Sequence, residues 1–165
     1  MKISDILTKG RVTGSCEVCR VEDVLRDTAA LGPDFISVTY GAGCSTSKRT
    51  LELAARLQDA YHVPALAHLT CVSSTREEVT QQVARLRAAG IGSILALRGD
   101  IPQDTSFPTP EHFRYASELI AHIRGLEGGQ ELCIGAACYP EGHVECPHFS
   151  TDLDHLKQKV DAGAD

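Results

Sequence analysis

Short apolar runs alternate with longer amphipathic segments along the chain, and this rhythm constrains the fold more than any other feature. Such runs are typical of strands in a parallel sheet whose two faces are both covered. Strands are therefore predicted at Ser15–Cys19, Phe35–Tyr40, Pro64–Thr70, Ser93–Arg98 and Leu132–Tyr139.

The segments between these runs carry apolar residues at helical spacing, which predicts amphipathic helices. A short first helix is expected within Asp23–Leu31. The longer helices are predicted at Ser47–Tyr61, Arg76–Ala89, Pro110–Arg124 and Thr151–Ala162. Thr75 and Ser150 are candidate N-caps, and Gly90 is the residue type that commonly follows the end of a helix. Strand and helix in regular alternation indicate an α/β fold with right-handed crossovers.

Two architectures of this class are open, a doubly wound sheet and a (β/α)₈ barrel. Polar residues lie at or just beyond the carboxyl end of nearly every predicted strand, among them His68 and Thr70 at the third and Arg98–Asp100 at the fourth. A barrel builds its site from many strand ends in this way, whereas a doubly wound sheet concentrates it at one switch point. We therefore predict an incomplete TIM-barrel type of fold with about five βα units.

Composition limits the kind of partner. The chain has 165 residues, which suits a single domain, and its net charge of −6 argues against general binding of nucleic acid. No segment reaches the roughly 20 apolar residues that span a bilayer, and the N-terminus lacks the features of a signal peptide. The odd number of cysteines, seven, favours reduced thiols in a cytoplasmic protein.

Five motifs lie in register at the ends of consecutive predicted units. They read PDFISVTYGAG at 33–43, AHLTC at 67–71, ILALRGD at 94–100, YPEGH at 139–143 and DLDHLKQKVDAGAD at 152–165. Their order and spacing resemble those of the methylenetetrahydrofolate reductase family. Residues 1–165 are accordingly interpreted as a partial β/α barrel domain of that type.

The resemblance implies a flavoprotein oxidoreductase that uses FAD, with NADH or NADPH as hydride donor. The substrate of the family is the folate 5,10-methylenetetrahydrofolate, which is reduced to 5-methyltetrahydrofolate in one-carbon metabolism and methionine biosynthesis. Two catalytic residues are implied. Glu17 would be the general acid that protonates the folate, and Asp100 would be the electrostatic partner beside the flavin.

The same resemblance implies a set of residues that hold FAD. They are Thr39, Tyr40, Ala42, His68, Arg98, Gly99, Asp100, Tyr115, Ala116, Tyr139, His143, Asp152, His155 and Lys159. Asp152, His155 and Lys159 stand at i, i+3 and i+7, which places them on one face of the last predicted helix. Lys159 is the natural partner of a phosphate.

The first unit departs from the family pattern, because cysteines replace its aromatic residues and about ten residues are missing before the second strand. The last three units are absent. The alternative function is therefore a non-catalytic or truncated flavin-binding remnant, or a subunit of such a barrel. Such a subunit would need a partner chain, or a second copy of itself, to complete the barrel. An aldolase-like barrel is disfavoured, since no lysine lies within a predicted strand.

A zinc site is also weighed, because Cys16 and Cys19 have zinc-like spacing and a second group lies in the loop after the fifth predicted strand. That second group is formed by Cys138, His143, Cys146 and His148. Residues three apart on a strand point to opposite faces, so the first pair diverges, and no metal is predicted.

Overall fold

The computed structural model describes residues 17–39, 47–72, 74–101 and 108–165. Its centre is a parallel sheet in which four strands follow one another in the order β1-β2-β3-β4. The strands are β1 (Ile36–Val38), β2 (Ala65–Thr70), β3 (Ser93–Leu97) and β4 (Cys133–Ala136). The order never reverses, so this part of the chain has no switch point of the doubly wound kind. It is the sequential α/β arrangement expected of an incomplete barrel.

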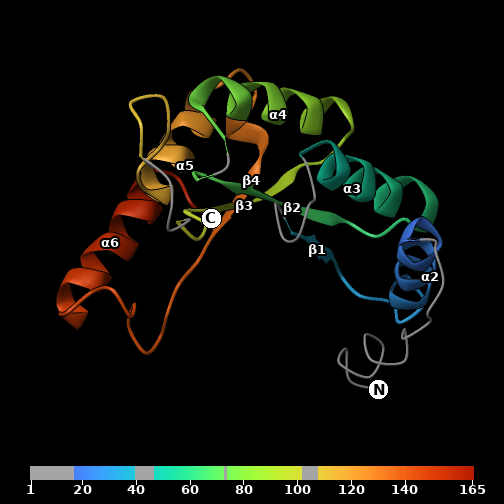
Figure 1. The fold of residues 1–165 in the computed structure, drawn as a ribbon, viewed down its shortest axis with the longest axis horizontal. Coiled ribbons are helices and arrows are strands. Elements are labelled where there is room, and N and C mark those ends of the chain that lie inside the picture. Colours follow the sequence, from blue (N-terminus) through green and yellow to red (C-terminus); the bar gives the residue numbers. More distant parts are fainter. Residues whose placement is uncertain (1–16, 40–46, 73, 102–107) are drawn as a thin grey trace.

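Helices connect and follow the strands. They are α2 (Glu17–Ala29), α3 (Ser47–Tyr61), α4 (Arg76–Ala88), α5 (Ala116–Gly125) and α6 (Phe149–Asp161), with a short 3₁₀ turn at Gly129–Glu131 before β4. Figure 1 shows α3 and α4 along one side of the sheet, with α2 beyond α3 and α6 at the opposite end. In the described ranges, no helix combines the length and the apolar character that crossing a bilayer requires.

The core lies between the sheet and the helices. Ala65, Ala67 and Leu69 alternate along β2 as fully buried residues, and Ile94 continues this layer on β3. The residues between them, such as His68, are only half-buried and point to the other face of the sheet. The helix side of the sheet is therefore the packed core, and the other face is left for a ligand or a further protein surface.

Local sequence signals explain both ends of α4. Thr75 caps α4 as predicted. The Glu78 amide donates to its hydroxyl at 3.3 Å, and the Glu78 carboxylate accepts from the Thr75 amide at 2.8 Å. Gly90 follows with φ at +73°, also as predicted. The prediction of Ser150 as an N-cap was wrong, because α6 begins at Phe149 with His148 as its N-cap residue.

The predicted strand at Ser15–Cys19 was wrong over the residues that the structure describes. Glu17–Cys19 form the first turn of α2, so the described residues contain four strands where five were expected in the chain. Val21 and Leu25 stand four residues apart on this helix and pack toward the core. A short apolar run is compatible with a strand or a helix, and here the burial of Val21 and Leu25 on one helical face favours the helix.

Candidate functional site

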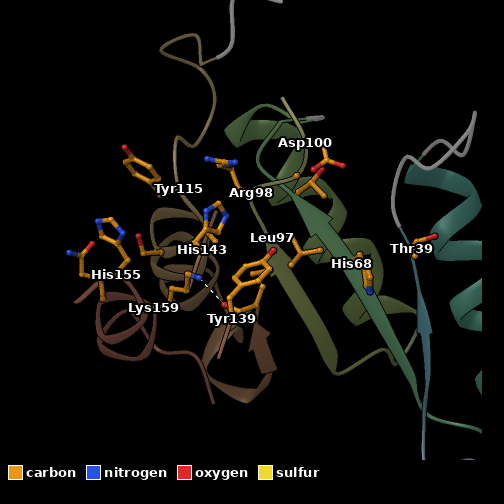
Figure 2. Close-up of a pocket in the computed structure, with 17 residues that line it drawn as sticks. Thr39, His68, Leu97, Arg98, Asp100, Tyr115, Tyr139, His143, His155 and Lys159 are labelled. Carbon is orange, nitrogen blue, oxygen red and sulfur yellow. Dashed lines mark hydrogen bonds between the residues drawn. The ribbon is translucent and has the colours of Figure 1, made fainter. Parts of the chain in front are cut away.

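A cavity of about 610 Å³ opens at the carboxyl ends of the strands. It extends from the end of β1 across β2 and β3 to one side of α6 (Figure 2). The register places these ends side by side, since Thr70 of β2 is level with Leu97 of β3. Its described lining residues are Thr39, His68, Thr70, Ala96, Leu97, Arg98, Gly99, Asp100, Tyr115, Ala116, Ser117, Ala137, Tyr139, His143, His155, Gln158 and Lys159.

Most of the predicted site residues meet in this one cavity. Of that set, Tyr40 and Ala42 lie outside the described residues. Asp152 does not line the cavity, because its carboxylate turns toward the preceding loop and accepts from the His143 amide at 3.0 Å. Glu17 begins α2, and its side chain lies outside the described part of the structure. Its role as an acid remains a prediction.

The cavity has a cationic side formed by Arg98 and Lys159. The Arg98 guanidinium makes a two-pronged ion pair with Glu145, at 2.8 and 3.1 Å. These hydrogen bonds raise the pKa of Arg98 and lower that of the Glu145 carboxyl. Lys159 donates to the Ala137 carbonyl at 2.8 Å, drawn as a dashed line in Figure 2. A primary ammonium has three donors, so Lys159 can also bind an anion in the cavity.

The opposite side of the cavity is less charged. The His68 ring nitrogen Nε2 lies 2.5 Å from the Ser37 hydroxyl. Burial lowers the pKa of His68, so the ring is neutral near pH 7 and can either donate or accept a hydrogen bond. The His68 side of the cavity therefore suits a flat, weakly charged ring. Tyr139 and His143 lie near Lys159 instead (Figure 2), and their rings meet edge-on with centroids 4.9 Å apart.

Thr70 offers a ligand a buried hydrogen-bonding group at the cavity wall. Its hydroxyl is buried and has no hydrogen-bond partner within the described residues. A buried hydroxyl without a partner is costly, and this one lies at the cavity wall. Beside it, Gly99 has φ at +83°, and a Cβ there would lie 3.2 Å from the Thr70 Cβ. Glycine thus lets the Arg98–Asp100 turn pass close over the end of β2.

The sequence reasoning did not assign several lining residues to the site. Thr70 was named among the polar residues at the strand ends but was not assigned to the cofactor, although it follows His68 by two positions and so points to the same face of the strand. Gln158 lies three residues after His155, which is one helical turn. The remaining unassigned residues, Ala96, Leu97, Ser117 and Ala137, are small or apolar and carry no chemical signature of a site.

Cys71, at the end of the AHLTC motif, does not take part in thiolate chemistry. Its side chain is fully buried, and burial raises the pKa of the thiol to about 12. The thiol stays protonated at neutral pH and packs as a small apolar residue.

Fold and cavity together define a class. This is an α/β protein of sequential parallel βα units, with a cavity at the carboxyl ends of its strands that has a cationic side and a less charged side. A solved structure of 2,3-dimethylmalate lyase, a member of the PEP mutase/isocitrate lyase superfamily, is similar in fold, with a TM-score of 0.57. The match covers 86% of this chain and 53% of that one at 13% identity. At this identity it speaks only for the fold.

The sequence comparisons give the family. The family model described as methylenetetrahydrofolate reductase matches residues 15–165, and the chain belongs to this family. It is 40% identical over 147 residues to the probable methylenetetrahydrofolate reductase (NADH) of Oryza sativa subsp. japonica. It is 37% identical over 136 residues to the 5,10-methylenetetrahydrofolate reductase of Escherichia coli strain K12.

These matches cover 82% of this chain in both cases, but only 25% of the rice protein and 44% of the bacterial one. The chain thus spans less than half the length of these relatives. The family resemblance inferred from the five motifs is confirmed.

Proposed function

We propose that the cavity binds FAD and that the chain takes part in the NAD(P)H-dependent reduction of 5,10-methylenetetrahydrofolate. The observation that carries this proposal is the convergence of the family's motif residues on one cavity. The same cavity contains the buried Thr70 hydroxyl, which has no hydrogen-bond partner among the described residues. Membership of the family supports the reaction class. The volume of the cavity lies within the range of small-molecule and cofactor sites.

The residues fit the two halves of such a cofactor. A dinucleotide joins a negatively charged diphosphate to aromatic rings, and the cavity offers Lys159 and Arg98 at one side and neutral His68 at the other. Figure 2 shows these side chains spread along the cavity, so an extended ligand can contact all of them. Thr70 would donate to, or accept from, a polar edge of the ring system.

The chain's own residues would divide the chemical work. Bound FAD would supply reversible transfer of a hydride between the nicotinamide donor and the folate. Asp100 is exposed at the mouth of the cavity and would stabilise positive charge on the folate there. Lys159 would bind the diphosphate, and an anion reaching Arg98 would have to compete with Glu145 for the guanidinium. Glu17 is proposed as the acid that protonates the folate.

An apolar face of α6 and the edge of β4 support the proposal that a partner chain, or a second copy of this chain, completes the barrel. Phe149, Leu153, Leu156 and Val160 form an apolar stripe along α6, and no residue of this helix is fully buried. Of these, Val160 is 57% exposed. Within the described residues, β4 pairs with only one other strand of the sheet, β3. Further βα units packed there would cover both features.

The test is an absorbance titration of the purified chain with FAD, followed by NADH without oxygen. We expect a perturbed flavin spectrum that bleaches when NADH is added. Lys159→Gln should weaken FAD binding about tenfold, because a charge-assisted hydrogen bond is lost. Lys157→Gln is the matched control on the same helix, since Lys157 pairs with Asp161 at 2.5 Å and does not line the cavity.

Unaltered flavin spectra at micromolar protein, or an equal loss of affinity in the two lysine variants, would contradict a flavin site in this cavity. Flavin binding without bleaching would separate the two halves of the proposal. It would retain the cofactor and reject the nicotinamide half-reaction for a chain of this length.

A further inference from the structure

Three metal-binding side chains of different chemical type meet where the loop after β4 runs into α6. Cys146 comes from the loop, and Asp152 and His155 come from the first two turns of the helix. One ligand atom from each lies within 4.8 Å of the other two. We propose that these three residues bind a divalent transition-metal ion, with zinc the best match.

The geometry is close to that of a zinc site. Bond lengths of about 2.3 Å to sulfur and about 2.0–2.2 Å to nitrogen and oxygen, at tetrahedral angles, place ligand atoms roughly 3.4–3.6 Å apart. The three atoms need to approach one another by about 1 Å or slightly more to meet this requirement. Cys146 is in a loop and His155 is exposed, so rotations of the side chains can supply the movement.

Hydrogen bonds from the surroundings hold the ligands in place. The Cys146 thiol donates to the His148 carbonyl at 3.4 Å, and a metal ion would replace this weak bond. The Asp152 carboxylate accepts from the His143 amide through Oδ2, at 3.0 Å, which leaves Oδ1 for a metal. The Cys146 amide donates to the His143 carbonyl at 2.9 Å, and this turn brings the thiol over the start of α6. Hydrogen bonds that orient a metal-binding carboxylate in this way are the usual support of a metal site.

Ligand type and charge select the metal. A thiolate and a carboxylate carry two negative charges, which balance a divalent cation, while the imidazole adds none. Sulfur and imidazole nitrogen favour zinc over magnesium or calcium, which prefer oxygen. Three protein ligands leave a fourth position for water or a small anion, as in zinc sites with an open position.

The site differs from the one weighed from the sequence. That group contained Cys138, His143, Cys146 and His148, and only Cys146 belongs to the cluster. Asp152 and His155 were assigned to the cofactor instead. The sequence favoured no metal because it could not show that the loop folds back over α6.

A metal here would tie the 143–146 turn to α6. This turn carries Glu145, which pairs with Arg98 at the cavity wall. The metal would therefore fix the position of the carboxylate that competes for Arg98. The inference does not depend on flavin binding, because the metal can be titrated without any nucleotide.

The experiment is a titration of the metal-free chain with zinc against a chromophoric chelator, and with cobalt followed by absorbance. We expect one zinc per chain and a near-ultraviolet thiolate-to-cobalt charge-transfer band. Cys146→Ser should abolish that band. Asp152→Asn and His155→Gln should each lower zinc affinity at least about tenfold, since loss of a supporting residue alone costs that much.

Two control variants keep the test specific. Cys138→Ser removes an exposed thiol that lies outside the cluster, and Asp154→Asn removes an exposed carboxylate of α6. Both should bind zinc as the unmodified chain does, and circular dichroism checks that each variant stays folded. Zinc affinity that is unchanged in Cys146→Ser, or that falls equally in Cys138→Ser, would overturn the proposal.

Discussion

Thr70→Val tests whether a ligand binds at the Thr70 hydroxyl. The substitution should stabilise the unliganded chain and weaken its affinity for FAD. The Thr70 hydroxyl is buried and unpartnered within the described residues. An unsatisfied buried polar group costs about 1–3 kcal/mol, and valine replaces the hydroxyl by a methyl group of similar size. Thr70 retains 8% exposure, so the lower end of the range applies. We expect the free energy of unfolding of the unliganded chain to rise by about 1 kcal/mol.

The same substitution should weaken the ligand. If FAD supplies the missing hydrogen bond, its loss is equivalent to about 0.5–1.5 kcal/mol, or roughly a two- to twelvefold decrease in affinity. Urea unfolding measures the first effect, and flavin fluorescence titration measures the second. For a chain of this size the stability gain corresponds to a melting temperature about 2–4 °C higher.

Thr50→Val is the matched control for stability. Thr50 is also buried, at 3% exposure, but its hydroxyl donates to the Thr39 carbonyl at 3.1 Å. Loss of this bond should destabilise the chain by about 1 kcal/mol. The two threonine variants should therefore shift the melting temperature in opposite directions. Equal destabilisation would mean that the Thr70 hydroxyl is satisfied in the free protein, and it would refute the argument for a ligand at this position.

Two further predictions concern charge. Arg124→Lys should lower the free energy of unfolding in urea by about 2–3 kcal/mol, because the guanidinium donates to the Gly129, Leu132 and Gly163 carbonyls and lysine cannot reach all three; an unchanged midpoint would contradict this. The Arg98–Glu145 pair lowers the pKa of the Glu145 carboxyl below its usual 4.5, so its stabilising contribution is present above pH 4.5 and is lost as the pH falls through the lowered value. When the free energy of unfolding is measured from pH 7 to pH 3, Glu145→Gln should depend less on pH than the unmodified chain does. An identical pH dependence in that variant would refute the prediction.

The parts of the fold that the sequence could predict are those with a local cause. Helix α3 was predicted with its observed bounds, because leucines and alanines repeat there at helical spacing. The strands β2 and β3 were placed to within a residue at either end. Their apolar runs are bounded by polar residues at the carboxyl ends, where parallel strands assemble a site.

Tertiary packing determined the type or the bounds of the elements that were predicted wrongly. Helix α5 begins at Ala116, six residues after the predicted start, because Phe113 is buried in the core and Tyr115 is extended. The first apolar run entered a helix because Val21 and Leu25 could pack toward the core. A short apolar run is compatible with either structure, and only its neighbours decide between them.

Helix α6 shows why one of its three predicted cofactor residues does not line the cavity. At about 100° per residue, His155 and Lys159 lie roughly 60° and 20° to one side of Asp152, and Gln158 lies still further round, at about 120°. The cavity faces the sector shared by these three residues, which leaves Asp152 at its rim and one turn nearer to the loop. At that position the His143 amide in the loop donates a hydrogen bond to the Asp152 carboxylate. Spacing alone placed the three residues on one face, but the position of the loop turns the Asp152 carboxylate toward the His143 amide, while His155 and Lys159 line the cavity.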